Sequence, residues 1–212
     1  MILSLLSVFL LSPMQDAPPV DCVARPSDCR TLREYSLKAY GQTIVIDGGA
    51  VVPWFQDGAL MVFVGESVVV DVDGEKPVVE SHGRASEVLA ESRLGPLLGL
   101  VQGVTDEAPR LHSSDPLELD GPDGRLRISF IQGPGVEDMI LTVENGYEGA
   151  LTYRAVMMAL GPDGQTRWAR TSVCTVPPGI YVFEHWPHPI VGLALGGFAI
   201  APKDAPVEPV CI

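Results

Sequence analysis

The sequence predicts an all-β protein with at most one short helix. Glycine and proline, with 22 and 19 residues among 212, are spread along the whole chain, and helix breakers distributed in this way favour short strands. Turn sequences recur between apolar runs, among them Asn145-Gly146 and two Gly-Pro-Asp-Gly tetrapeptides that begin at Gly121 and Gly161. With 46% hydrophobic and 19% charged residues, the chain has the composition of an ordinary folded domain.

The runs of β-branched or alternating residues between these turns are each expected to form a strand. The clearest hairpin joins two such runs through Gly161-Pro162-Asp163-Gly164. Short strands joined by tight turns indicate an antiparallel barrel or, as we prefer, an antiparallel β-sandwich that is immunoglobulin-like or related. The expected strands are Thr43–Ile46, Leu60–Val64, Ser67–Val72, Leu126–Gln132, Met139–Glu144, Leu151–Ala159, Thr166–Cys174, Ile180–His185 and Val191–Ile200.

One short helix is expected at Ala85–Leu94, where Gly95 could serve as its terminator. It lies in a long connection from Glu80 to Pro116. We divide the chain into a signal peptide (1–17), a disulfide-containing segment (18–40) and a β-sandwich domain (41–212). The alternative is two intimately packed halves with a boundary within 80–116.

The first residues resemble a signal peptide. Ile2–Leu11 is an apolar run of the right length for its hydrophobic region and too short to cross a bilayer as a helix. Cleavage is expected after Ala17, although no basic residue precedes the run and Gln15 fits the cleavage site poorly. The alternative is that the run forms a buried strand or helix of the mature fold. We therefore predict a periplasmic or extracellular protein without a transmembrane span in its mature chain.

The amino-acid usage points to a bacterial source. Eleven of the 14 basic residues are arginine, and Asn145 is the only asparagine. Arginine, alanine, glycine, proline and valine have GC-rich codons, so this usage indicates a GC-rich genome.

Four cysteines, an even number, agree with export to an oxidising compartment. They allow three pairings, and proximity favours Cys22–Cys29 with Cys174–Cys211. The second bond would attach the proline-rich C-terminus to a strand. A structural zinc site is the alternative, but the close cysteine pairs that such sites use are absent.

The charge of the chain excludes one class of partner. With 27 acidic and 14 basic residues, the formal net charge is −13, and no basic stripe is present to bind phosphates. We therefore expect no nucleic-acid partner and no docking on an anionic membrane. No familiar catalytic or nucleotide-binding motif occurs in the sequence, and no cofactor is expected.

The densest group of reactive side chains is Glu184-His185-Trp186-Pro187-His188. Two histidines and a glutamate could hold a metal ion, or a histidine could act as a general base. On a strand, however, Glu184 and His185 would point to opposite faces unless the chain turns. The alternative is a structural corner in which Trp186 packs on the core. We retain Glu184, His185, Trp186 and His188, with Tyr181, as candidate binding residues.

Two acidic groups are weaker candidates for a cation site. Asp115, Glu118, Asp120 and Asp123 lie beside a turn and could bind Ca²⁺, but a solvated acidic turn explains them better. The run Asp71–Glu75 has the same two interpretations, and a hairpin turn accounts for its Asp-Gly pair.

Aromatic residues gather in the C-terminal strands, where they could form a stacking platform for a sugar or peptide, or simply pack in the core. They are Tyr147, Tyr153, Trp168, Tyr181, Phe183 and Trp186. The leading hypothesis is a non-enzymatic envelope module that binds a protein partner or assists envelope assembly. The alternatives are an exported, metal-dependent hydrolase using Glu184, His185 and His188, and a structural subunit of a larger assembly.

Overall fold

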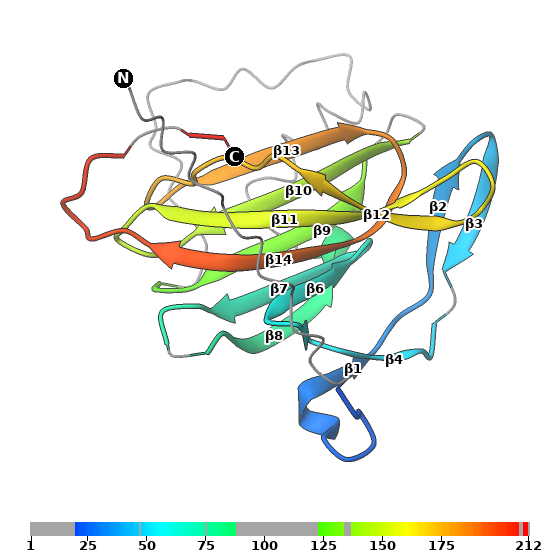
Figure 1. Cartoon of the computed structure of the whole chain (residues 1–212), viewed down its shortest axis with the longest axis horizontal. Coiled ribbons are helices and arrows are strands. Elements are labelled where there is room, and N and C mark those ends of the chain that lie inside the picture. Colours follow the sequence, from blue (N-terminus) through cyan, green and yellow to red (C-terminus); the bar gives the residue numbers. More distant parts are fainter. Residues whose placement is uncertain are drawn as a thin grey trace, which may run out of the picture.

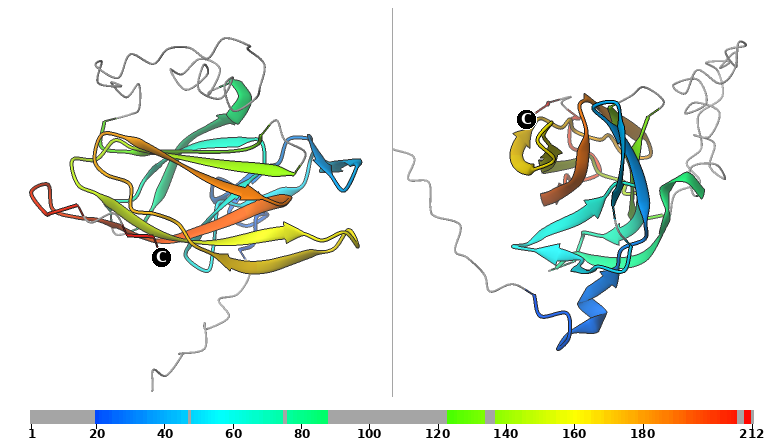
Figure 2. Two further views of the ribbon diagram at one scale, coloured as in Figure 1. Left: turned by 90° about the horizontal axis from the view of Figure 1, so that it is seen from above. Right: turned by 90° about the vertical axis from the view of Figure 1, so that its right-hand side faces the viewer.

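Two five-stranded antiparallel sheets pack face to face in the computed structural model of the chain (Figures 1 and 2). The structure describes residues 20–46, 48–74, 76–87, 123–133, 137–207 and 210–211. We call one layer the β10 sheet, with strand order β13-β10-β9-β7-β8, and the other the β11 sheet, with order β12-β11-β14-β6-β5. The prediction of an all-β sandwich is confirmed.

The strand bounds give the order along the chain. The β10 sheet contains β7 (Glu66–Asp71), β8 (Val78–Arg84), β9 (Leu126–Gln132), β10 (Asp138–Asn145) and β13 (Tyr181–Pro187). The β11 sheet contains β5 (Phe55–Gln56), β6 (Ala59–Phe63), β11 (Leu151–Leu160), β12 (Thr166–Thr171) and β14 (Ile190–Ile200). The connections β6–β7, β10–β11, β12–β13 and β13–β14 pass from one sheet to the other, so the chain itself ties the layers together.

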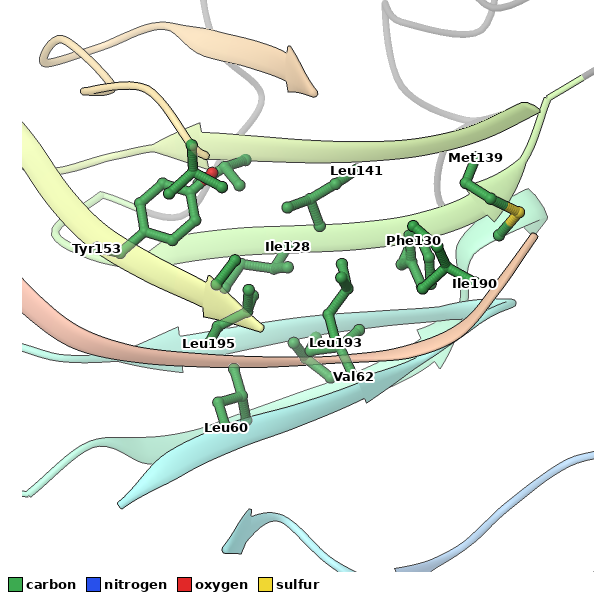
Figure 3. Packing of buried hydrophobic residues seen from close by; sticks show 14 of the residues in the cluster. Leu60, Val62, Ile128, Phe130, Met139, Leu141, Tyr153, Ile190, Leu193 and Leu195 are labelled. Atoms are coloured by element: carbon green, nitrogen blue, oxygen red, sulfur yellow. The ribbon is translucent and has the colours of Figure 1, made fainter. Parts of the chain in front are cut away.

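The core lies between the two sheets (Figure 3). Strand alternation supplies it: Leu151, Tyr153 and Ala155 of β11 are buried, whereas Thr152 and Arg154 between them are exposed. Fully buried residues from both layers meet there, including Leu60, Val62, Ile128, Phe130, Leu141, Leu193 and Leu195.

The N-terminal part adds two small strand pairs outside the main sheets. A short 3₁₀ helix, η1 (Pro26–Asp28), precedes β1 (Cys29–Thr31), which pairs with β4 (Val51–Pro53). The hairpin of β2 (Tyr35–Ala39) and β3 (Gln42–Ile46) stands at the end of the sandwich shown on the right of Figure 1. The Tyr40 hydroxyl at its tip donates to the carbonyl of Leu160 at 2.7 Å.

Gly65 joins the two sheets at the β6–β7 turn, and no other residue type fits there. Its φ of +89° is costly for residues with a Cβ atom. A Cβ atom at this position would also lie only 2.4 Å from the Tyr35 ring. The ring therefore packs directly on the turn and anchors the β2–β3 hairpin to the sandwich.

Most expected strands agree with the structure, and the β9 bounds are identical to those predicted. One is shorter, because β12 ends at Thr171 rather than Cys174. The sequence prediction missed β1, β2, β4, β5 and β8, and β8 occupies the start of the connection expected from Glu80. Of the expected helix, Ala85–Glu87 is helical. Its remainder, the predicted signal peptide, Asp115, Glu118 and Asp120 lie outside the described residues.

Both favoured disulfides, Cys22–Cys29 and Cys174–Cys211, are present in the structure. The second bond attaches the C-terminal tail as expected, but Cys174 lies in the segment that follows β12 and not on the strand where it was predicted. Two such bonds are compatible with an exported protein. Among the described residues, no helix is both long enough and apolar enough to cross a membrane.

Candidate binding surface

The Glu184–His188 cluster does not converge on one point. Trp186 lies in the core, and its Nε1 donates to Thr171 Oγ1 at 2.7 Å. Glu184 shares that side of β13, whereas His185 points to the outer face, as strand alternation requires. The chain bends only at His188, after Pro187 has ended the strand, so the turn comes too late to bring Glu184 and His185 together.

The two histidines of the cluster have separate neighbours. His185 Nε2 lies 3.3 Å from Asp138 Oδ1 on the outer face of the β10 sheet. His188 Nε2 lies 3.2 Å from the sulfur of Met157 on β11. Within the described ranges, no three histidine, cysteine, aspartate or glutamate side chains are grouped as metal ligands.

Glu184 has a structural contact of its own. Its Oε1 accepts a hydrogen bond from the Cys174 amide at 2.7 Å, which holds the start of the β12–β13 connection against β13. Burial raises the pKa of the Glu184 carboxyl, and the Cys174 amide opposes this change. Tyr153 lies near enough for the negative charge of Glu184 to add to the effect of burial in raising the tyrosine pKa.

The acidic runs have turn contacts where the structure describes them. Asp71 ends β7, and its Oδ1 accepts hydrogen bonds from the Asp73 amide and the Tyr147 hydroxyl. These two bonds lower the pKa of Asp71. The Asp73-Gly74 bend connects β7 to its antiparallel neighbour β8. The structure therefore agrees with the interpretation of the Asp71–Glu75 run as a hairpin turn. Of the group Asp115, Glu118, Asp120 and Asp123, only Asp123 is described, and it lies in an exposed turn before β9.

The aromatic residues divide among three environments. Tyr147, Tyr153 and Trp186 are buried. Tyr181 and Phe183 form an edge-to-face pair on the outer side of the β10 sheet. Trp168 lies on the outer face of the β11 sheet and is 54% exposed. It is therefore a large aromatic side chain offered to solvent.

Apolar side chains continue from Trp168 across the outer face of the β11 sheet. Strand register sets four residues in a row across the sheet, in the order Trp168, Met158, Gly192 and Phe63. A Cβ atom at position 192 would lie 3.0 Å from the Phe63 ring, so glycine lets that ring rest on the sheet. The adjacent row runs from Arg170 through Val156 and Ala194 to Met61. Val156, Met158 and Ala194 are half-buried.

Two arginines border these apolar residues. Arg170 and Arg154 are exposed on the same face, on the adjacent strands β12 and β11. Most other described arginines are paired, as Arg167 is with Asp163 and Arg127 with Glu144, and Arg33 is the exception. Arg154 and Arg170 form no ion pair with any carboxylate of the described residues. We call Arg154, Val156, Met158, Trp168 and Arg170 the Trp168 surface.

A buried ion pair closes the β6 side of this face. The Arg30 side chain, 2% exposed, donates Nε and Nη2 to the two carboxylate oxygens of Glu66 at 2.7 and 2.6 Å. Its remaining donors reach the carbonyls of Pro53 and Met61, at 2.9 and 2.8 Å. The guanidinium also lies 4.1 Å from the centre of the Trp54 ring. Because these contacts use four of its five N–H groups, Arg30 joins the first strand to both sheets and is not free to bind a ligand.

Sequence reasoning named Trp168 among the aromatics but missed Arg154, Arg170 and Arg30. The available signal was the period of two along β11 and β12, which places Arg154, Val156 and Met158 on the non-core face. The pairing of Arg30 had no sequence signal, because Glu66 lies 36 residues away. Comparison of the chain with protein-family models, with curated proteins and with solved structures gives no match.

Proposed function

We propose that the chain is an exported, non-enzymatic β-sandwich module that binds a protein partner through the Trp168 surface. Export rests on the two disulfides and on the signal-like Ile2–Leu11 run, with cleavage after Ala17. The bacterial periplasm or cell surface is the proposed compartment, and envelope assembly is the proposed context.

The observation that carries this proposal is the exposure of Trp168 beside Val156 and Met158. Tryptophan and arginine are enriched where proteins bind one another, because they combine a large apolar area with polar contacts. Trp168, Arg154 and Arg170 form such a group on a regular sheet face. The Glu184, His185 and His188 side chains of the alternative hydrolase point in different directions, so no observation favours that function.

Site-specific photo-crosslinking in the native host tests the proposal. A photoreactive amino acid at position 168 should give a discrete adduct with one partner protein. The matched control is position 78, because Val78 is 57% exposed and lies on the edge strand β8 of the other sheet. Adducts at both positions, or at neither, would contradict the proposal. Mass spectrometry of the same sample should place the mature N-terminus at Pro18.

A further inference from the structure

We propose that the Trp168 surface takes an extended acidic segment of the partner, which pairs with β12 as an additional strand. This inference rests on the proposed function and specifies the chemistry of the partner. On the face that meets Trp168 and Arg170, the segment carries apolar and carboxylate side chains in turn, at every second residue.

The open edge of the sandwich is β12. An edge strand offers unpaired backbone N–H and C=O groups, which proteins usually protect. The strand β5 has only two residues, β13 ends in Pro187, and the β7–β8 register shifts between Val69 and Val70. In contrast, β12 has six residues, contains no proline and pairs with β11 in unbroken register (Figure 1). Among the four edges of the two main sheets, β12 is the one least protected against an added strand.

The charges on this edge select an acidic occupant. Trp168 and Arg170 are two residues apart and therefore lie on the same face of β12. A strand added beside them would place alternate side chains next to the indole and next to the guanidinium. An apolar side chain at the first position and a carboxylate at the second match both neighbours, and Arg154 adds a second positive charge nearby.

The charges also disfavour a second copy of this chain as the occupant. Two chains would each bring a net charge of −13. Symmetric pairing of two β12 strands would also bring the arginines of both copies to one interface, where like charges repel. An acidic strand from another protein meets the same net charge but brings no arginines of its own to the interface, so its carboxylates can pair with Arg170 and Arg154.

Peptide titration of the full mature protein tests the inference. The probe is a seven-residue capped peptide in which valine and glutamate take turns at every second position, with threonine between them, so that both lie on one face of the strand. Its partner probe replaces every glutamate by lysine. We expect saturable binding of the glutamate peptide, weakened by added salt, and at least roughly tenfold weaker binding of the lysine peptide. A glutamate peptide with proline at its centre should bind more weakly, because proline cannot donate to β12.

Charge reversal at Arg170 sharpens the test. The Arg170→Glu variant should lose at least roughly tenfold in affinity for the glutamate peptide and gain affinity for the lysine peptide. The matched control is Arg33→Glu, because Arg33 is also exposed and has no ion pair with the described carboxylates but lies between β1 and β2. That control should leave binding unchanged. Circular dichroism should show native β-structure in both variants.

Four outcomes would overturn the inference: no binding up to about 1 mM peptide, equal binding of the two peptides, equal effects of the two arginine variants, or concentration-dependent self-association that Arg170→Glu changes. An adduct at position 168 without glutamate-peptide binding would leave the proposed function standing and remove this inference. Absence of that adduct would remove the proposed function itself.

Discussion

Replacement of Arg30 by methionine should destabilise the fold more than any surface substitution. The change keeps a long side chain but removes the charge that balances Glu66, whose side chain is 13% exposed. It also leaves the carbonyls of Pro53 and Met61 without the guanidinium donors. Breaking a buried ion pair from one side costs about 3–5 kcal/mol, which is a large share of a total stability of about 5–15 kcal/mol.

A second substitution separates the charge from the packing. Glu66→Gln removes the stranded negative charge and keeps an oxygen for the Phe63 amide, which donates to Glu66 at 2.8 Å. The double variant Arg30→Met/Glu66→Gln should therefore be more stable than Arg30→Met alone. Arg30→Lys is the matched control, because it keeps the charge but loses the two-pronged contact. Its loss should be smaller than that of Arg30→Met.

Urea unfolding at neutral pH with both disulfides intact measures these differences. Tryptophan fluorescence should report the transition, and the change in midpoint at constant slope gives the change in unfolding free energy. A loss below about 1 kcal/mol for Arg30→Met, or a double variant less stable than the single one, would show that the buried-pair reasoning is wrong.

Three further predictions concern the core and the disulfides. The Tyr153 hydroxyl is buried without a hydrogen-bond partner among the described residues, so Tyr153→Phe should raise the unfolding free energy by about 1 kcal/mol. In contrast, Tyr147→Phe should lower it by about 1–2 kcal/mol, because the Tyr147 hydroxyl forms hydrogen bonds with Asp71 and Val72. Urea unfolding checks both, and a loss of stability in the Tyr153→Phe variant would contradict the first. Burial raises the pKa of the Glu184 carboxyl, so the folded state favours the protonated form and its stabilising contribution is lost as pH rises through the folded-state pKa. The Glu184→Gln variant should therefore gain stability relative to the wild type between about pH 4 and pH 8, and a constant difference in thermal midpoint would oppose this. Replacing both Cys174 and Cys211 by serine should lower the unfolding free energy by about 4 kcal/mol, and replacing Cys22 and Cys29 should lower it by about 2 kcal/mol, because the bonded residues are 37 and 7 positions apart. Equal losses of stability in calorimetry would refute the loop-length argument.

The sequence predicted strands whose two faces differ clearly in polarity. The hairpin strand Leu151–Ala159 alternates buried and exposed residues at its start, and Leu126, Ile128 and Phe130 alternate on the core face of the run Leu126–Gln132, so a period of two identifies both. In the second run, Ser129 and Ile131 of the other face are buried as well. The strand β8, with the sequence VVESHGR, shows no such contrast because it lies at a sheet edge and is largely exposed. The strand β2 does alternate, with Leu37 and Ala39 buried and Ser36 and Lys38 exposed, and the sequence prediction missed it nonetheless.

Long-range contacts set the limit of the prediction. The sequence identified Asn145-Gly146 as a turn. The side-chain Nδ2 of Asn145 donates to the carbonyls of Gly149 and Val176 at 2.9 and 3.0 Å. The first contact is local, but the second joins residues 31 positions apart and requires the folded sandwich. Strand alternation also predicted the divergence of Glu184 and His185. It could not show that the following bend starts only at His188.

The same limit explains why the candidate surface was not identified from the sequence. The sequence alone does not tell whether Trp168 is a core or a surface residue, because either face of a strand can bear an aromatic side chain. The neighbours of β12 must be known to decide this. Sheet order makes β12 an edge, and its register with β11 places Trp168 beside Met158 and Arg170 beside Val156. Whether an arginine has a carboxylate as its ion-pair partner likewise depends on residues that are distant in the sequence. The surface is therefore a property of strand order, and substitutions that preserve this order but change Arg170 should alter binding without altering the fold.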